Sequence, residues 1–130
     1  MSRTVWIRRD VVLAIHRRQL AEHGGAEGTR DSGLLEFALA RPENLAAYSD
    51  ETPDLAALAA AYAYGIARDR PFVDGNKRTA LVVCRTFLVL NKRHVKASRE
   101  EKYLTFLELA ASNVSEEALG TWLRERMVSV

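Results

Sequence analysis

A short polar stretch, residues 69–80 with the sequence DRPFVDGNKRTA, carries residue types that could do chemistry. Gly75 allows a close backbone approach or a positive φ, and an apolar helix is predicted to begin directly after it. The first turn of a helix carries backbone N–H groups without intrahelical partners, which make an anion site. Lys77 and Arg78 add cationic donors at that end, although positive charge there opposes the helix dipole. Such a local inconsistency often marks function, and here it predicts a phosphate-binding turn.

Two neighbours of this turn fit a nucleotide-phosphate site. Asp74 supplies a carboxylate, and Mg²⁺ beside phosphates commonly takes one or two protein oxygens and keeps most of its waters. Asn76 can donate to a phosphate oxygen or orient the loop. A purely structural interpretation stays open, because Asp-Gly-Asn is also a turn signature and Asp74 could simply cap the following helix. The G-x-x-x-x-G-K-[ST] spacing of a Walker loop is absent from the sequence.

Two helices must hold this stretch in place. Residues 55–69 are rich in alanine and apolar nearly all round, which predicts a central, buried helix. Residues 76–91 are predicted to form the next helix. Its run LVVCRTFLVL could also be a buried strand, but a length of ten residues or more favours helix.

Capping and breaking residues predict four further helices. These are 11–23 (capped by Asp10, ended by Gly24 and Gly25), 32–40 (capped by Asp31 or Ser32, stopped before Pro42), 98–112 (with a capping box of Ser98 and Glu101) and 116–127 (started by Ser115). The only strand candidates are residues 4–7 and 94–96. The sequence therefore predicts one all-α domain over residues 1–130.

Composition places the chain among ordinary globular proteins. Its 130 residues suit one domain, and the formal net charge is only +2. A protein that binds nucleic acid or a membrane over its whole surface usually has a more lopsided charge. A nucleic-acid binder stays an alternative, but its basic residues are more simply solvated helix ends: Arg17, Arg18, Lys92, Arg93 and Lys96. We therefore expect no direct nucleic-acid binding and no membrane partner.

The cytoplasm is the expected location. The single cysteine, Cys84, cannot form an internal disulfide, which suits a reducing compartment. The N-terminus has no apolar run after its basic residues and does not resemble a secretory signal. The longest apolar stretch, residues 55–67, is too short to span a bilayer.

Residues 70–78, RPFVDGNKR, closely resemble the motif of the Fic/Doc family, whose general form is H-x-F-x-[DE]-[AG]-N-[KG]-R. Residues 76–80, NKRTA, resemble the Doc (death-on-curing) toxin branch in particular. Residues 30–42, RDSGLLEFALARP, match a pattern often seen upstream in Doc-like proteins. The resemblance implies an all-α bundle of about six helices, with the motif loop between two central helices.

The resemblance also implies site residues and a substrate, ATP with Mg²⁺. Carried over by position, Asp74 would be the metal-binding acid and Phe72 would anchor the loop in the core. Arg68, just before the motif, would help to position the substrate or a phosphate. The phosphate-binding turn would consist of Gly75, Asn76, Lys77 and Arg78, and Asp74, Lys77 and Arg78 would also take part in catalysis.

Two positions favour the Doc reaction within the family. Adenylylating Fic enzymes usually carry G-N-G-R-x-x-R, whereas this chain has Lys77 at the second glycine and Leu81 at the final arginine. Proteins resembling Doc transfer the γ-phosphate of ATP to a hydroxyl on elongation factor Tu, which stops translation. The resemblance therefore implies a toxin that acts as a protein kinase, and adenylyl (AMP) transfer is the alternative reaction.

Arg70 stands where the family motif has its catalytic histidine. A general base needs a pKa near the working pH, whereas the pKa of arginine lies above ~12 and the group stays charged. The remaining histidines, His16, His23 and His94, are more simply surface or structural residues. We therefore predict a catalytically inactive chain. It is either a form inactivated by engineering or selection, or a natural member that acts as a non-catalytic nucleotide- or protein-binding module.

An inhibitor in trans is the expected partner. Some family members carry an inhibitory helix with the pattern [ST]-x-x-x-E-[GN], but Ser112 to Glu116 is followed by Glu117. Doc-like toxins are typically silenced by the tail of a Phd-like antitoxin, which folds into a surface groove. Trp122 and Leu123 are candidates for the groove wall, but such residues more often belong to the core.

Overall fold

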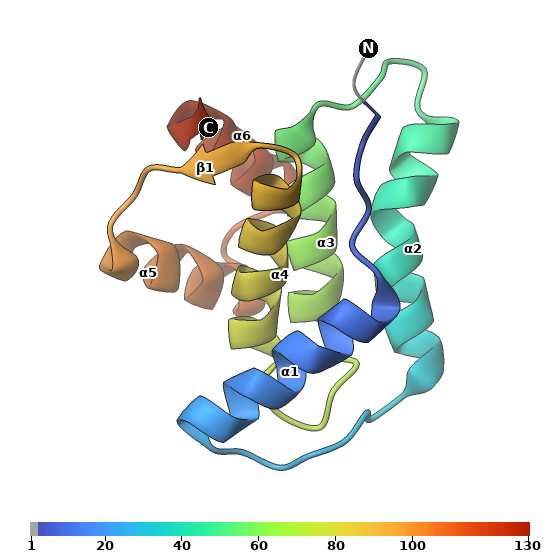
Figure 1. Ribbon diagram of the computed structural model, residues 1–130, viewed down its shortest axis with the longest axis vertical. Helices are drawn as coiled ribbons and strands as arrows, with labels where there is room; N and C mark the ends of the chain where they lie inside the picture. The colour runs from blue at the N-terminus through green and yellow to red at the C-terminus, as the bar shows by residue number, and fades with distance from the viewer. Residues whose placement is uncertain (1–2) are drawn as a thin grey trace.

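The computed structural model describes residues 3–130, which form six α-helices and one small two-stranded sheet (Figure 1). This arrangement confirms the predicted all-α fold. In chain order the elements are α1 (Arg9–His23), α2 (Ser32–Tyr48), α3 (Leu55–Asp69), α4 (Asn76–Leu90), β1 (Arg93–Val95), α5 (Arg99–Ala110), α6 (Glu116–Arg126) and β2 (Met127–Ser129).

Helix α3 is the centre of the bundle, as its composition predicts. Ten of its fifteen residues are buried, and it packs against α2, α4 and α6. Small side chains let its neighbours approach closely: a Cβ on Gly65 would lie only 3.2 Å from the Cα of Ala38 on α2. The phosphate-binding turn predicted from the sequence therefore follows the most extensively buried helix of the structure.

The run LVVCRTFLVL, for which the sequence also allowed a strand, is helical and forms most of α4. One side of α4 is buried, and the ring of Phe87 packs 5.0 Å from Tyr62 of α3 and 6.1 Å from Trp6, measured between ring centroids. Helix α1 crosses the lower ends of α3 and α4 and packs against α4, next to the loop that joins the two helices (Figure 1).

The predicted end of the second helix was wrong, because α2 continues through Pro42 to Tyr48. Proline in a helix interior removes one hydrogen bond and costs about 3 kcal/mol. Pro42 is nevertheless buried, and Leu45 one turn later packs against the core. Tertiary burial therefore outweighs the local stop signal. Of the two candidate caps, Asp31 is the one observed: its carboxylate accepts from the Leu34 N–H at 3.1 Å.

Two predictions near the N-terminus were also wrong. The first helix begins one residue before Asp10 and is capped by Arg8 without a side-chain bond, so Asp10 lies in the first turn. Residues 4–7 form no strand. The backbone of Val5 bonds to a side chain instead of a neighbouring strand. Its N–H donates to the Asn91 Oδ1 at 2.8 Å, and its carbonyl accepts from the Asn91 Nδ2 at 2.9 Å.

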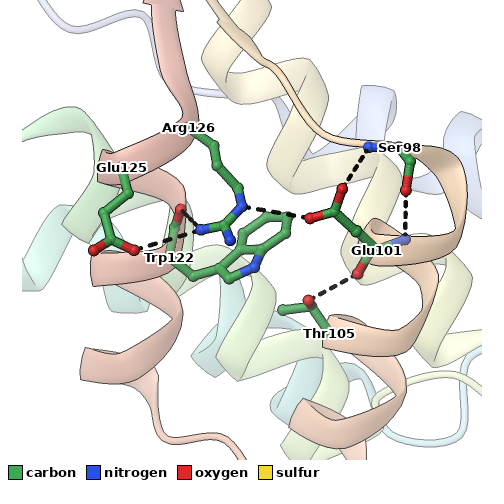
Figure 2. A network of polar contacts seen from close by, with 6 residues as sticks. All are labelled: Ser98, Glu101, Thr105, Trp122, Glu125 and Arg126. Atoms are coloured by element: carbon green, nitrogen blue, oxygen red, sulfur yellow. Dashed lines mark hydrogen bonds and ion pairs between the residues drawn. The ribbon is translucent and has the colours of Figure 1, made fainter.

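The C-terminal part holds the sheet and a polar contact between helices. The predicted strand 94–96 is observed as β1, one residue earlier, and it pairs antiparallel with β2, which was not predicted. The predicted capping box of Ser98 and Glu101 is confirmed. Figure 2 shows Arg126 of α6 beside Glu101 of α5, 3.8 Å from its carboxylate and 4.5 Å from the ring centroid of Trp122.

Among residues 3–130, none of the helices has the length and apolar character needed to cross a membrane.

Candidate active site

The motif loop joins the two central helices and is shaped by unusual backbone at both ends. Helix α3 is followed by its C-cap residue Arg70, whose φ of 52° and ψ of 60° place it in the left-handed region. Helix α4 begins after Gly75, whose φ is 78°. Left-handed geometry suits glycine but is unfavourable for a residue with a Cβ, so the geometry at Arg70 needs support from its surroundings.

Inside the loop, Asn76 and Phe72 fix one another. The Asn76 Oδ1 accepts from the Phe72 N–H and the Asn76 Nδ2 donates to the Phe72 carbonyl, each at 3.0 Å. Both residues are buried, with Phe72 only 1% exposed. Asn76 therefore orients the loop, which is one of its two predicted roles, and Phe72 lies in the core, where the resemblance expects its anchor.

His16 of α1 supports the loop from the other side. Its ring stacks on Phe72 with 3.8 Å between centroids and 9° between planes. Its Nε2 lies 2.8 Å from the carbonyl oxygen of Asp74 and therefore donates a hydrogen to it. The sequence alone predicts only a surface or structural role for His16. The structural role is observed, but no sequence signal links two residues that are 58 positions apart.

The connection between α1 and α2 runs along the motif loop (Figure 1). Thr29 and Phe72 form an isolated antiparallel bridge, and the Val73 N–H donates to the Gly28 carbonyl at 3.1 Å. The Pro71 carbonyl accepts from the N–H groups of Arg30 and Asp31, at 2.7 and 3.1 Å. The motif loop is thus held on one side by α1 and on the other by the segment that follows it.

The start of α4 has the features of an anion-binding turn. Its N-cap, Gly75, offers no side chain to the free N–H groups, and the first helical bond is made by Thr79 N–H to the Gly75 carbonyl at 3.0 Å. The alternative in which Asp74 caps this helix is not observed, since its Oδ1 accepts from the Gly75 N–H instead. The N–H groups of Asn76, Lys77 and Arg78 precede the first bond and lack helical partners.

A cavity of about 600 Å³ opens over this turn. The motif contributes three cationic side chains, Arg70, Lys77 and Arg78, and one carboxylate, Asp74. Helix α1 closes one wall with Gln19, Leu20 and His23, and α5 closes another with Tyr103, Leu107 and Ala110. The volume lies in the range of small-molecule sites, and the excess of positive charge favours an anionic ligand.

The Asp74 carboxylate fits the role of a single Mg²⁺ ligand. It is exposed at the cavity, and its two oxygens accept from the N–H groups of Gly75 at 2.8 Å and Ala26 at 3.4 Å. Each oxygen keeps further acceptor capacity. Within residues 3–130 no cluster of three or more His, Cys, Asp or Glu could hold a metal, so a cation here would take its other ligands from phosphates and water.

Three residues singled out from the sequence lie elsewhere. Arg68 is exposed and points to a separate cavity, where its guanidinium lies 5.3 Å from the ring centroid of Tyr64. The structure therefore does not bring Arg68 to the motif cavity. Leu123 is 1% exposed and belongs to the core, whereas Trp122 is partly buried and packs against the core.

The fold and the site define a small helical protein with an anion-favouring cavity at the start of a central helix. The model of the Fic/DOC family matches residues 6–88. The chain is 34% identical over 113 residues to Protein kinase doc of Escherichia phage P1, covering 87% of this chain and 88% of that protein. It is 46% identical over 68 residues to Toxin Doc of Mycolicibacterium smegmatis, covering 52% of each, so this match spans about half of that relative. The chain belongs to the Fic/DOC family.

Proposed function

We propose that this chain is a Doc-like toxin whose site binds ATP with Mg²⁺ but transfers phosphate poorly or not at all. The observation that carries the proposal is the motif cavity, in which three cations and one carboxylate surround an uncapped helix start. The names of its relatives, Toxin Doc and Protein kinase doc, support a toxin that acts as a phosphotransferase.

The phosphates of ATP would lie on the first turn of α4. Free N–H groups and the positive end of the helix favour an anion there, and Lys77 and Arg78 add charge. Asp74 would hold Mg²⁺, which supplies charge neutralisation to the phosphates when it is bound. Asn76 and Phe72 would support the ligand indirectly, because their mutual hydrogen bonds keep Gly75 and its neighbours in place.

The target would be a hydroxyl on elongation factor Tu, and the family base that accepts its proton is missing. Arg70 lines the cavity, so its side chain can bind a phosphate through its fork of donors. It cannot accept a proton, and losing a positioned base costs roughly 10²–10⁴ in rate. His16 does not replace it, because it is only 4% exposed and does not line the motif cavity.

We further propose that a Phd-like antitoxin binds in a second cavity of about 970 Å³ between α1, α4 and α5. Its apolar lining includes Leu81, Leu104 and Phe106, and Leu104 is 57% exposed. Five basic side chains line it against two acidic ones: Lys77, Arg78, Arg85, Arg99 and Lys102 against Glu22 and Glu100. This pattern favours an acidic, amphipathic helix that folds on binding.

Two measurements test the proposal. Titration calorimetry should detect Mg²⁺-dependent ATP binding by the chain, and Lys77→Ala should weaken it about tenfold or more, since a charged donor to phosphate is lost. Induction of Arg70→His in bacteria should slow growth, and induction of the unchanged chain should not. If ATP binds but Arg70→His is harmless, the chain is a non-catalytic module. If ATP does not bind, the nucleotide site itself is refuted.

A further inference from the structure

We propose that Arg30 is a positioning residue that holds the backbone of residue 70 in its left-handed conformation and thereby aims the side chain at position 70 into the cavity. Arg30 lies on the segment between α1 and α2, forty positions from the residue that it holds. Its effect on ligand binding rests on the proposed function, whereas its effect on the backbone does not.

The main evidence is that Arg30 donates hydrogen bonds to three consecutive backbone carbonyls, those of residues 69–71. The Arg30 Nη2 donates to the Asp69 carbonyl and the Arg30 Nε donates to the Arg70 carbonyl, both at 2.8 Å. The backbone N–H of Arg30 donates to the Pro71 carbonyl at 2.7 Å. Arg30 therefore bonds the carbonyls of all three residues 69–71, from the end of α3 into the motif loop.

The chemistry of arginine suits this place. The last carbonyls of a helix have no helical partners, and that end of the helix carries partial negative charge. A planar guanidinium can serve two neighbouring carbonyls at once and brings a positive charge, whereas lysine offers one compact ammonium group. Within residues 3–130 Arg30 makes no ion pair, and it lines neither the motif cavity nor the cavity beside it.

The side chain at position 70 depends on this support. Within residues 3–130 the guanidinium of Arg70 makes no hydrogen bond or ion pair, so no polar contact of its own fixes where it points. Its direction is set by its backbone, which has φ 52° and ψ 60°. Such geometry is unfavourable for a residue with a Cβ and persists only where the surroundings impose it. Arg30 provides three of the bonds that impose it.

A double-mutant cycle tests the role in binding. Arg70→Ala should weaken Mg²⁺–ATP binding about tenfold when Arg30 is present, as expected for a lost charged donor. In the Arg30→Ala background, Arg70→Ala should weaken it less than about twofold, because coupled residues are non-additive. The same tenfold loss in both backgrounds would overturn the proposal. Arg18→Ala, which removes an exposed arginine paired with Glu22, is the matched control and should leave the effect of Arg70→Ala unchanged.

A second readout needs no nucleotide. Backbone NMR chemical shifts of residues 69–71 report whether residue 70 is left-handed, and both Arg30→Met and Arg30→Ala should move them. Methionine keeps a long side chain but has no donor for the two carbonyls. Unchanged shifts in Arg30→Met would overturn the proposal, even if Arg30→Ala does not fold. If the unchanged chain binds no ATP, the proposed function fails, and the shifts alone decide the role of Arg30.

Discussion

The side-chain amide of Asn76 makes a reciprocal pair of 3.0 Å hydrogen bonds with the backbone N–H and carbonyl of Phe72. This pair closes the motif loop on itself, because Asn76 is the first residue of α4 and Phe72 sits in the core. The proposed phosphate-binding turn is therefore attached directly to the hydrophobic interior.

Asn76→Ala should destabilise the protein by about 2–4 kcal/mol, because it leaves two buried backbone groups of Phe72 without partners. Urea denaturation measures the change in the free energy of unfolding. Asn113→Ala is a suitable control, since that exposed amide bonds only the side chain of Glu108 at 2.9 Å and its loss should cost less than ~0.5 kcal/mol. Equal effects of the two substitutions would show that the loop does not depend on the Asn76 bonds.

Gly25→Ala should disturb the Asp74 carboxylate. A Cβ on Gly25 would lie 2.9 Å from Asp74 Oδ2, too close for the carboxylate to stay in place. We expect weaker Mg²⁺-dependent ATP binding, measured by calorimetry at several Mg²⁺ concentrations. Gly24→Ala is matched, because Gly24 also has a positive φ but a Cβ there would meet nothing within 4 Å. A loss of Mg²⁺ dependence in both variants would assign the effect to backbone strain rather than to Asp74.

Thr79→Val should be neutral or stabilise the protein by up to about 1 kcal/mol. The Thr79 hydroxyl is fully buried and has no hydrogen-bond partner among the residues that the structure describes. Valine keeps the shape of the side chain and removes the unpaired polar group. Thermal and urea unfolding measure the difference, with Thr79→Ser as the polar control. A clear destabilisation by valine would mean that the hydroxyl has a partner in solution.

The ion pair of Asp54 and Arg124 should make stability fall in acid. Arg124 donates to the Asp54 carboxylate at 2.5 and 3.0 Å, and these bonds lower the pKa of Asp54 despite an opposing effect of burial. A carboxyl with a lowered folded pKa stabilises the protein above its unfolded pKa and loses this effect as pH falls through the folded value. Both side chains are half exposed, so the contribution at pH 7 should stay below ~1 kcal/mol.

Urea unfolding of the unchanged chain and of Arg124→Gln at several pH values checks this sign. The difference between the two should be largest near neutral pH and should shrink as the acid protonates Asp54. A difference that grows in acid would contradict the assignment of the lowered pKa to Arg124.

Local sequence signals predicted the fold well where the physics is local. The caps at Asp31 and Ser115 and the box at Ser98 act within one helical turn, and all three are observed. Pro42 misled the prediction because burial of α2 against α3 overrides a backbone preference that acts over a few residues.

The site was only partly visible in the sequence for the same reason. The motif itself is contiguous, so its cavity-lining residues could be named. The supports that shape it, His16 under Phe72 and Arg30 on residues 69–71, come from distant positions, and no periodicity or spacing relates them to the loop. Arg68 illustrates the opposite error. It lies next to the motif in the sequence, but its side chain lines a different cavity.

The most direct test of the central claim measures label transfer to elongation factor Tu. The unchanged chain and Arg70→His are each incubated with the target and with γ- or α-labelled ATP and Mg²⁺. We predict that Arg70→His transfers the γ label and not the α label, and that the unchanged chain is at least about 10²-fold slower. Transfer of the α label would indicate adenylyl transfer instead. Equal rates for the two chains would contradict the account. In that case, loss of the activity of the unchanged chain on His23→Gln substitution would identify His23, which lines the cavity, as the substitute base.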